Sequence, residues 1–185
     1  MDKLCEDLTR TILDALSHGK NVTNPVLDFA PIHLANVILG LEDVKQRESK
    51  VASEVWLIKP SLDTDLQLFN KIIRYNLLER KITYRYLIPR EDEVITQWQR
   101  FVRDLRLDPK QQGTLEVRTL ESYFIESEVV IYDPYSAQEE VLIMSPRERE
   151  HVFWYSVGKT RGERIRKRYE ALWKDPTSKP LAESM

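Results

Sequence analysis

The stretch EVWLIKPSLDTDLQLFNKIIRYNLLERKITYRYLIP, residues 54–89, decides the fold because it contains two apolar runs separated by an amphipathic segment. EVWLIKP (54–60) and KITYRYLIP (81–89) are short, carry β-branched and aromatic residues and end in proline, as buried strands do. The segment between them, 61–80, has apolar residues at helical spacing: Leu62, Leu66, Phe69, Ile72 and Ile73. A strand, a helix and a strand in this order predict two parallel strands joined by a right-handed crossover.

The sequence on the C-terminal side extends this unit. Residues 90–107 predict a second amphipathic helix with an inward face of Val94, Trp98, Phe101, Val102 and Leu105. Four further strands are predicted at 114–120, 128–134, 139–145 and 151–157. A last helix is predicted from 158 to 174, with Ile165, Tyr169, Leu172 and Trp173 on its apolar side. We therefore expect a three-layer α/β domain with a mixed sheet.

The two ends of the chain differ from this central part. Residues 2–17 and a segment that starts near Pro31 show helical periodicity, and the polar stretch 18–25 separates them. We expect an N-terminal helical extension over 1–50, the α/β domain over 51–175 and a disordered tail over 176–185.

The composition narrows the class of protein. The chain has 185 residues and a net charge of -2, so it has no overall attraction to nucleic acid, although a local basic patch is compatible with this balance. Its single cysteine, Cys5, forms no internal disulfide, and we expect a reducing, cytoplasmic setting. No apolar run approaches the roughly 20 residues that span a bilayer, so we expect no membrane partner.

The sequence predicts no catalytic residue, metal or cofactor. Its three histidines do not have the spacing of metal ligands, and His18, in His-Gly-Lys, falls in a turn outside the α/β region. None of its 5 glycines belongs to a phosphate-binding loop of the G-x-G-x-x-G or G-x-x-x-x-G-K type. A G-x-S-x-G nucleophile motif is absent as well.

The order of elements from Glu54 to Lys174, with EVWLIKP, YRYLIP and VVIYDP as strands, resembles one half of a phospholipase D-like domain. It is most similar to degenerate members that lack catalysis, including sensor domains of prokaryotic transcription regulators. The enzymes carry His-x-Lys-x-x-x-x-Asp. If Asp133 stands at the aspartate, Glu126 and Glu128 take the histidine and lysine positions, where a carboxylate repels a phosphodiester and the imidazole nucleophile is missing.

The resemblance therefore implies that Asp133 ends a strand as part of an Asp-Pro turn. A shifted register would change this pairing, but no register places His-x-Lys on these strands.

Two groups of residues are candidates for binding. Tyr84 and Tyr86 share one face of their strand, and core packing is their commoner role. The alternative is a ligand site near the carboxyl end of that strand, for which the candidates are Tyr84, Tyr86, Asp133 and Tyr135. The last helix has a basic face formed by Arg161, Arg164, Lys167 and Arg168. A solvated face is the commoner interpretation, and a phosphate or nucleic-acid contact is the functional one.

These observations predict a non-catalytic regulatory or sensory protein that binds a small ligand or a protein partner. The alternatives are a nucleic-acid-binding protein that uses the basic C-terminal helix and, less favoured, a phosphodiesterase or nuclease. We also expect a homodimer, because relatives in the phospholipase D-like superfamily pair two halves. The apolar stripe from Leu34 to Val44 and the pair Trp154 and Tyr155 offer material for that interface.

Overall fold

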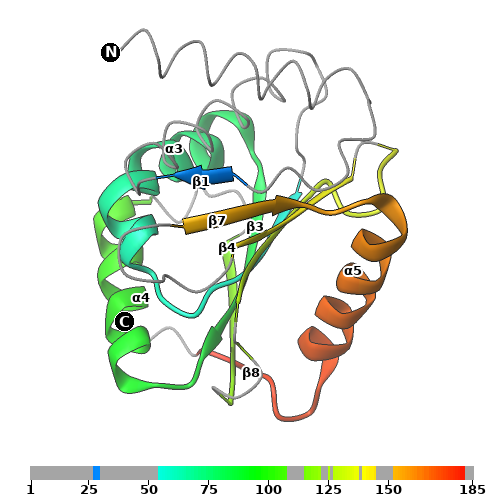
Figure 1. The fold of residues 1–185 in the computed structure, drawn as a ribbon. Coiled ribbons are helices and arrows are strands. Elements are labelled where there is room, and N and C mark those ends of the chain that lie inside the picture. Colours follow the sequence, from blue (N-terminus) through cyan, green and yellow to red (C-terminus); the bar gives the residue numbers. More distant parts are fainter. Residues whose placement is uncertain are drawn as a thin grey trace, which may run out of the picture.

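The computed structural model describes residues 27–29, 54–107, 115–121, 125, 127–137, 139–144 and 152–181. Within these residues, eight strands form one sheet in the order β1-β7-β6-β5-β2-β3-β4-β8. Figure 1 shows helices α3 and α4 on one face of the sheet and α5 on the other. The prediction of an α/β fold with a mixed sheet is confirmed.

Six strands, β2 to β7, agree with the predicted runs to within a few residues, whereas β1 lies within the predicted helical extension and β8 within the predicted disordered tail. Their ranges are β1 Leu27–Phe29, β2 Glu54–Ile58, β3 Thr83–Pro89, β4 Leu115–Leu120, β5 Glu128–Tyr132, β6 Glu140–Met144, β7 Val152–Ser156 and β8 Lys179–Pro180. Strands β2 and β3 run parallel, as predicted for residues 54–89, and β4 also pairs parallel with β3. The other pairings are antiparallel: β2 with β5, β5 with β6, β6 with β7, β7 with β1, and β4 with β8.

The chain changes direction across the sheet at β2. It first adds β3 and β4 on one side of β2 and then returns to place β5, β6 and β7 on the other side. Ile58, the last residue of β2, is opposite Val129, near the start of β5. Ligands of open α/β sheets bind outside the carboxyl ends of parallel strands, which here are the ends of β2, β3 and β4.

The helical segment between β2 and β3 has an irregular pitch. It consists of the π-helix η1 (Asp65–Phe69), the α-helix α3 (Asn70–Tyr75) and the π-helix η2 (Asn76–Arg80). Of its predicted inward residues, Leu62, Phe69 and Ile73 are buried, while Leu66 and Ile72 are partly buried against the same core. The first residue of each π-helix, Asp65 or Asn76, is also buried and bonds to a core tyrosine.

The helix after β3, α4 (Asp92–Leu105), has four of its five predicted inward residues in the core. The exception is Val102, which is 38% exposed, so its prediction as a core residue is wrong. Successive helical residues are about 100° apart, and Val102 therefore points away from the face that its neighbour Phe101 occupies.

Helix α5 (Lys159–Lys174) covers the second face of the sheet. Its Tyr169 is buried and stacks on Trp56 of β2, with 4.8 Å between the ring centroids. Ile165, Leu172 and Trp173 pack beside it on this second core, as the predicted apolar side requires.

The ends of the chain are described only in part. The helices predicted at 2–17 and from Pro31 lie outside the described residues. The disordered tail predicted over 176–185 is wrong for its first part, because Lys179 and Pro180 pair with β4 and Ser178 is buried. The guanidinium of Arg90 also donates a hydrogen bond to the carbonyl of Thr177 at 2.6 Å. No helix in the described ranges has both the length and the apolarity to cross a membrane.

Candidate anion-binding site at the carboxyl end of β2

A cavity of about 660 Å³ lies between α5 and the sheet at the carboxyl end of β2. Its floor is apolar and is formed by Ile58, Val129, Ile143, Ile165 and Leu172. Its polar lining residues are Ser127, Thr160, Arg161, Arg164 and Arg168. We call this cavity the arginine pocket. It lies at the carboxyl end of β2, and its volume is typical of small-molecule sites.

The three arginines come from one face of α5. They occupy positions i, i+3 and i+7, which project on the same side of a helix. All three are exposed, and none forms an ion pair with another described residue. Arg166, on the opposite side of α5, instead pairs with Glu139 at 2.6 Å and with Glu170 at 3.3 Å.

The fourth basic residue of the predicted face, Lys167, does not line the arginine pocket. Its ammonium pairs with Glu163 at 2.8 Å, one turn earlier on α5. The structure thus brings Arg161, Arg164 and Arg168 together and separates Lys167 from them.

The chemistry of the arginine pocket is selective for negative charge. Guanidinium groups stay protonated at every physiological pH, and among the described residues that line the cavity none is a carboxylate. An anion bound there would meet the three arginine cations. The apolar floor adds a surface on which an uncharged part of a ligand can pack.

No family model matches the chain, and no curated protein is significantly similar to it.

A buried ionic network lies on the other face of the sheet, at the same strand ends. The Lys59 ammonium is 2.8 Å from Asp65 Oδ2 and also pairs with Glu128, while the Tyr86 hydroxyl donates to Asp65 Oδ1 at 3.0 Å. We call these four residues the Lys59 network. Burial by itself lowers the pKa of Lys59, but the charges of Asp65 and Glu128 outweigh burial and raise it. Lys59 is therefore a cation at neutral pH and is not a free amine nucleophile.

The Lys59 network was not predicted from the sequence, although the position of Lys59 gave one indication of it. EVWLIKP carries a lysine directly after a buried run, where a charged side chain needs a partner. Glu128 is far from it along the chain, and the sequence pattern does not predict that Asp65 or Glu128 reaches it.

The predicted ligand-site tyrosines are core residues. Tyr84 and Tyr86 are 1% and 0% exposed, on the face of the sheet that packs on α3 and α4. The Tyr84 hydroxyl accepts a hydrogen bond from Asn76 Nδ2 at 2.7 Å. Neither tyrosine lines the arginine pocket. Core packing, the commoner interpretation of the two residues, is what the structure shows.

The other two predicted ligand-site residues, Asp133 and Tyr135, follow the carboxyl end of β5, whereas the arginine pocket lies near its amino end. Asp133 follows the last residue of β5, and its N–H donates to the carbonyl of Glu54 at 2.9 Å, at the amino end of β2. A strand rises about 3.3 Å per residue, so Asp133 is roughly 16 Å from Glu128. Tyr135 is exposed, and its ring lies 4.0 Å from the Arg166 guanidinium. The structure therefore does not gather the four predicted residues into one site.

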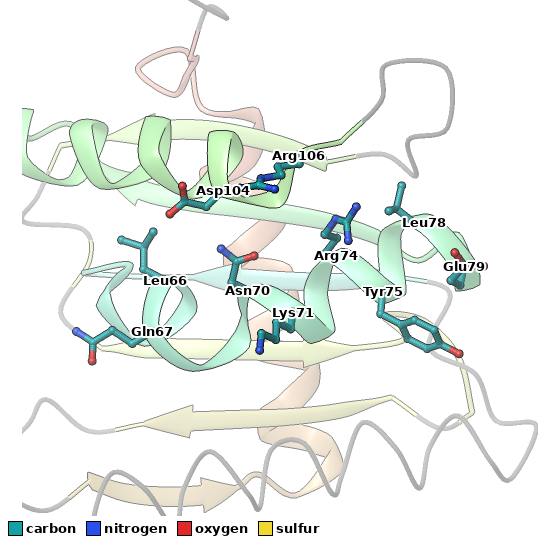
Figure 2. Close-up of a pocket in the computed structure, with 10 residues that line it drawn as sticks. All are labelled: Leu66, Gln67, Asn70, Lys71, Arg74, Tyr75, Leu78, Glu79, Asp104 and Arg106. Carbon is teal, nitrogen blue, oxygen red and sulfur yellow. The ribbon is translucent and has the colours of Figure 1, made fainter.

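A larger cavity of about 920 Å³ lies on the outer side of the helical layer. Figure 2 shows it between the segment 66–79 and the end of α4. Its charged residues are of both signs, with Lys71, Arg74 and Arg106 beside Glu79 and Asp104. The Arg74 Nε donates to the carbonyl of Leu105 at 2.8 Å, so this arginine ties the two helices together. The mixed charges favour no class of ligand.

Metal chemistry has no candidate site in the part of the chain that the structure describes. No group of three or more His, Cys, Asp or Glu side chains is arranged there to hold a metal ion.

Proposed function

We propose that this protein is a non-catalytic regulatory or sensory module that binds an anionic ligand in the arginine pocket. One observation carries the proposal: Arg161, Arg164 and Arg168 line one cavity over an apolar floor, and the part of the lining that the structure describes holds no carboxylate. Three like charges on one helix face repel one another, and a bound anion relieves that repulsion. Ligand binding of this kind would also stabilise the fold by mass action.

The proposal also covers the protein family, the oligomeric state and the cellular location. A degenerate phospholipase D-like half fold agrees with the order of elements from Glu54 to Lys174. The lack of catalysis is supported by Glu126 and Glu128, which take the positions of the essential histidine and lysine when Asp133 stands at the aspartate. A homodimer and a cytoplasmic location belong to the same proposal and rest on the family resemblance and on the single cysteine.

Nucleic-acid binding is the second candidate, because the same three arginines are exposed on α5. A duplex needs an extended row of phosphate contacts. Lys167, which would lengthen that row, is engaged by Glu163, and the arginines line a concave surface. We therefore favour a small anion over nucleic acid.

The test compares two charge-matched double variants of the full chain. Arg164→Ala/Arg168→Ala removes two pocket charges, whereas Arg100→Ala/Arg103→Ala removes two exposed charges from α4. We expect at least one of sulfate, citrate, phosphate, pyrophosphate or ADP, at millimolar concentration, to raise the melting temperature of the wild type and of the α4 variant. The pocket variant should not respond. Failure of all five anions to stabilise the wild type would refute the proposal.

A salt series with a short DNA duplex separates the second candidate. Nucleic-acid binding predicts an affinity that falls steeply with salt and is lost in the pocket variant. Duplex binding without any response to small anions would favour nucleic acid over the proposed function.

A further inference from the structure

We infer that the ligand of the arginine pocket is an elongated organic oligophosphate, with at least two linked phosphates and an apolar body. A nucleoside diphosphate is an example of this chemistry. The inference rests on the proposed function, since it names the class of anion that the same pocket takes.

The spacing of the charges argues for an elongated anion. A helix rises 1.5 Å per residue, so the Cα atoms of Arg161 and Arg168 are about 10 Å apart along the axis of α5, with Arg164 between them. A single phosphate or carboxylate could be reached by all three only if the guanidinium groups converged against their mutual repulsion. A chain of linked phosphates presents negative charge along a line and can engage the arginines in sequence.

The donor types favour phosphate over carboxylate. A guanidinium binds a phosphate group through two parallel N–H···O bonds, and each phosphate has enough oxygen atoms to accept further bonds. Thr160 on the first turn of α5 and Ser127 just before β5 add two hydroxyl groups to the lining. These hydroxyls can donate to the phosphate oxygens that the arginines leave free.

The floor argues for an apolar body. An inorganic anion would leave much of the 660 Å³ cavity unfilled and would hold water against five aliphatic side chains. Ile58 and Val129 are already nearly buried, while Leu172 and the rest of the floor keep part of their surface accessible. A ring or short chain attached to the phosphates would cover that surface and gain the hydrophobic contribution.

The experiment titrates the full chain with phosphate, pyrophosphate, AMP, ADP and citrate by isothermal calorimetry at constant ionic strength. We expect pyrophosphate to bind at least tenfold more tightly than phosphate, and ADP more tightly than either pyrophosphate or AMP. Arg164→Ala should weaken ADP roughly tenfold or more, the loss expected for one charge-assisted hydrogen bond. Arg103→Ala, on α4, should bind ADP as the wild type does.

A floor variant tests the apolar body separately. Leu172→Ala should weaken ADP and leave pyrophosphate unchanged, because pyrophosphate has no body to contact the floor. The pyrophosphate titration also shows that this variant is folded.

The outcomes separate the inference from the proposed function. Equal affinities for phosphate and pyrophosphate overturn the elongated anion, and equal affinities for pyrophosphate and ADP overturn the apolar body. Citrate binding that depends on Arg164, without binding of any phosphate compound, overturns the oligophosphate and leaves the anion pocket standing. Binding of no anion at all overturns both.

Discussion

Replacing Lys59 by methionine should destabilise the protein strongly. Methionine keeps the length of the side chain but removes the ammonium, so the carboxylates of Asp65 and Glu128 lose the cation between them. The site is buried, because Lys59 is 2% and Asp65 is 1% exposed. Removing one partner of a buried ion pair costs about 3–5 kcal/mol. That loss is a large part of the roughly 5–15 kcal/mol that holds a domain together. It corresponds to a fall in melting temperature of roughly 6–20 °C for a chain of this size.

Urea unfolding followed by circular dichroism measures this loss as a lower midpoint at an unchanged slope. The matched control is Lys167→Met, which breaks an exposed pair with Glu163 on α5 and should leave the midpoint unchanged within error. The double variant Lys59→Met/Asp65→Asn should recover part of the lost stability, because the Asp65 charge that Lys59 no longer balances is removed. A Lys59→Met variant within about 1 kcal/mol of the wild type would refute a buried network that depends on this cation.

The difference in unfolding free energy between the wild type and Lys59→Met should depend on pH in the way that the raised pKa of Lys59 dictates. A cation with a higher pKa in the folded state contributes its full stabilisation below its unfolded pKa of about 10.4 and loses it as the pH rises through the folded value. The difference between wild type and Lys59→Met should therefore stay constant from neutral pH to about pH 9 and narrow only at more alkaline pH. A difference that already shrinks between neutral pH and pH 9 would contradict the raised pKa.

Three further predictions follow from the fold and the proposal. Val102→Lys should change stability by less than about 0.5 kcal/mol, whereas Phe101→Ala should cost about 3–5 kcal/mol in the same urea assay; the reverse order would invert the assigned face of α4. The purified protein should not hydrolyse a generic phosphodiester, and turnover that Asp133→Ala abolishes would show that it is an enzyme. Light scattering after size exclusion should give twice the 21.9 kDa of one chain, and the single-chain mass across a dilution series would exclude the homodimer.

The sequence predicted the elements well because their type depends on local periodicity. EVWLIKP and KITYRYLIP became β2 and β3, and the amphipathic run at 90–107 became α4, since each element needs only to bury one stripe or one run. The strand β1 (Leu27–Phe29), which pairs with β7, was missed, and so were two details that depend on neighbouring residues. Lys179 and Pro180 form a strand only because the edge of β4 is open to them, and Val102 turns outward because Phe101 and Leu105 already occupy the inward face.

The site was predicted only where its residues share one element. The spacing of Arg161, Arg164 and Arg168 on one helix was visible in the sequence, but the cavity that they line was not. Its floor combines β2, β5, β6 and α5, and only the return of the chain across β2 brings these elements together. For the tyrosine pair, the alternation of side chains along a strand correctly placed Tyr84 and Tyr86 on one face. It did not predict whether that face packs in the core or lines a pocket.

The arginine pocket and the Lys59 network are linked by the alternation of side chains along two strands. Ile58 and Val129 face α5 and form part of the pocket floor, while the adjacent Lys59 and Glu128 face the helical layer and pair with each other. The ion pair across β2 and β5 therefore holds together the same two backbone segments whose alternate residues shape the pocket. Asp65 ties that pair to the first turn of η1, so the carboxyl end of β2 is fixed on one face by charge and left accessible on the other. A rigid strand end beside an open cavity is the arrangement that a binding site on an α/β sheet requires.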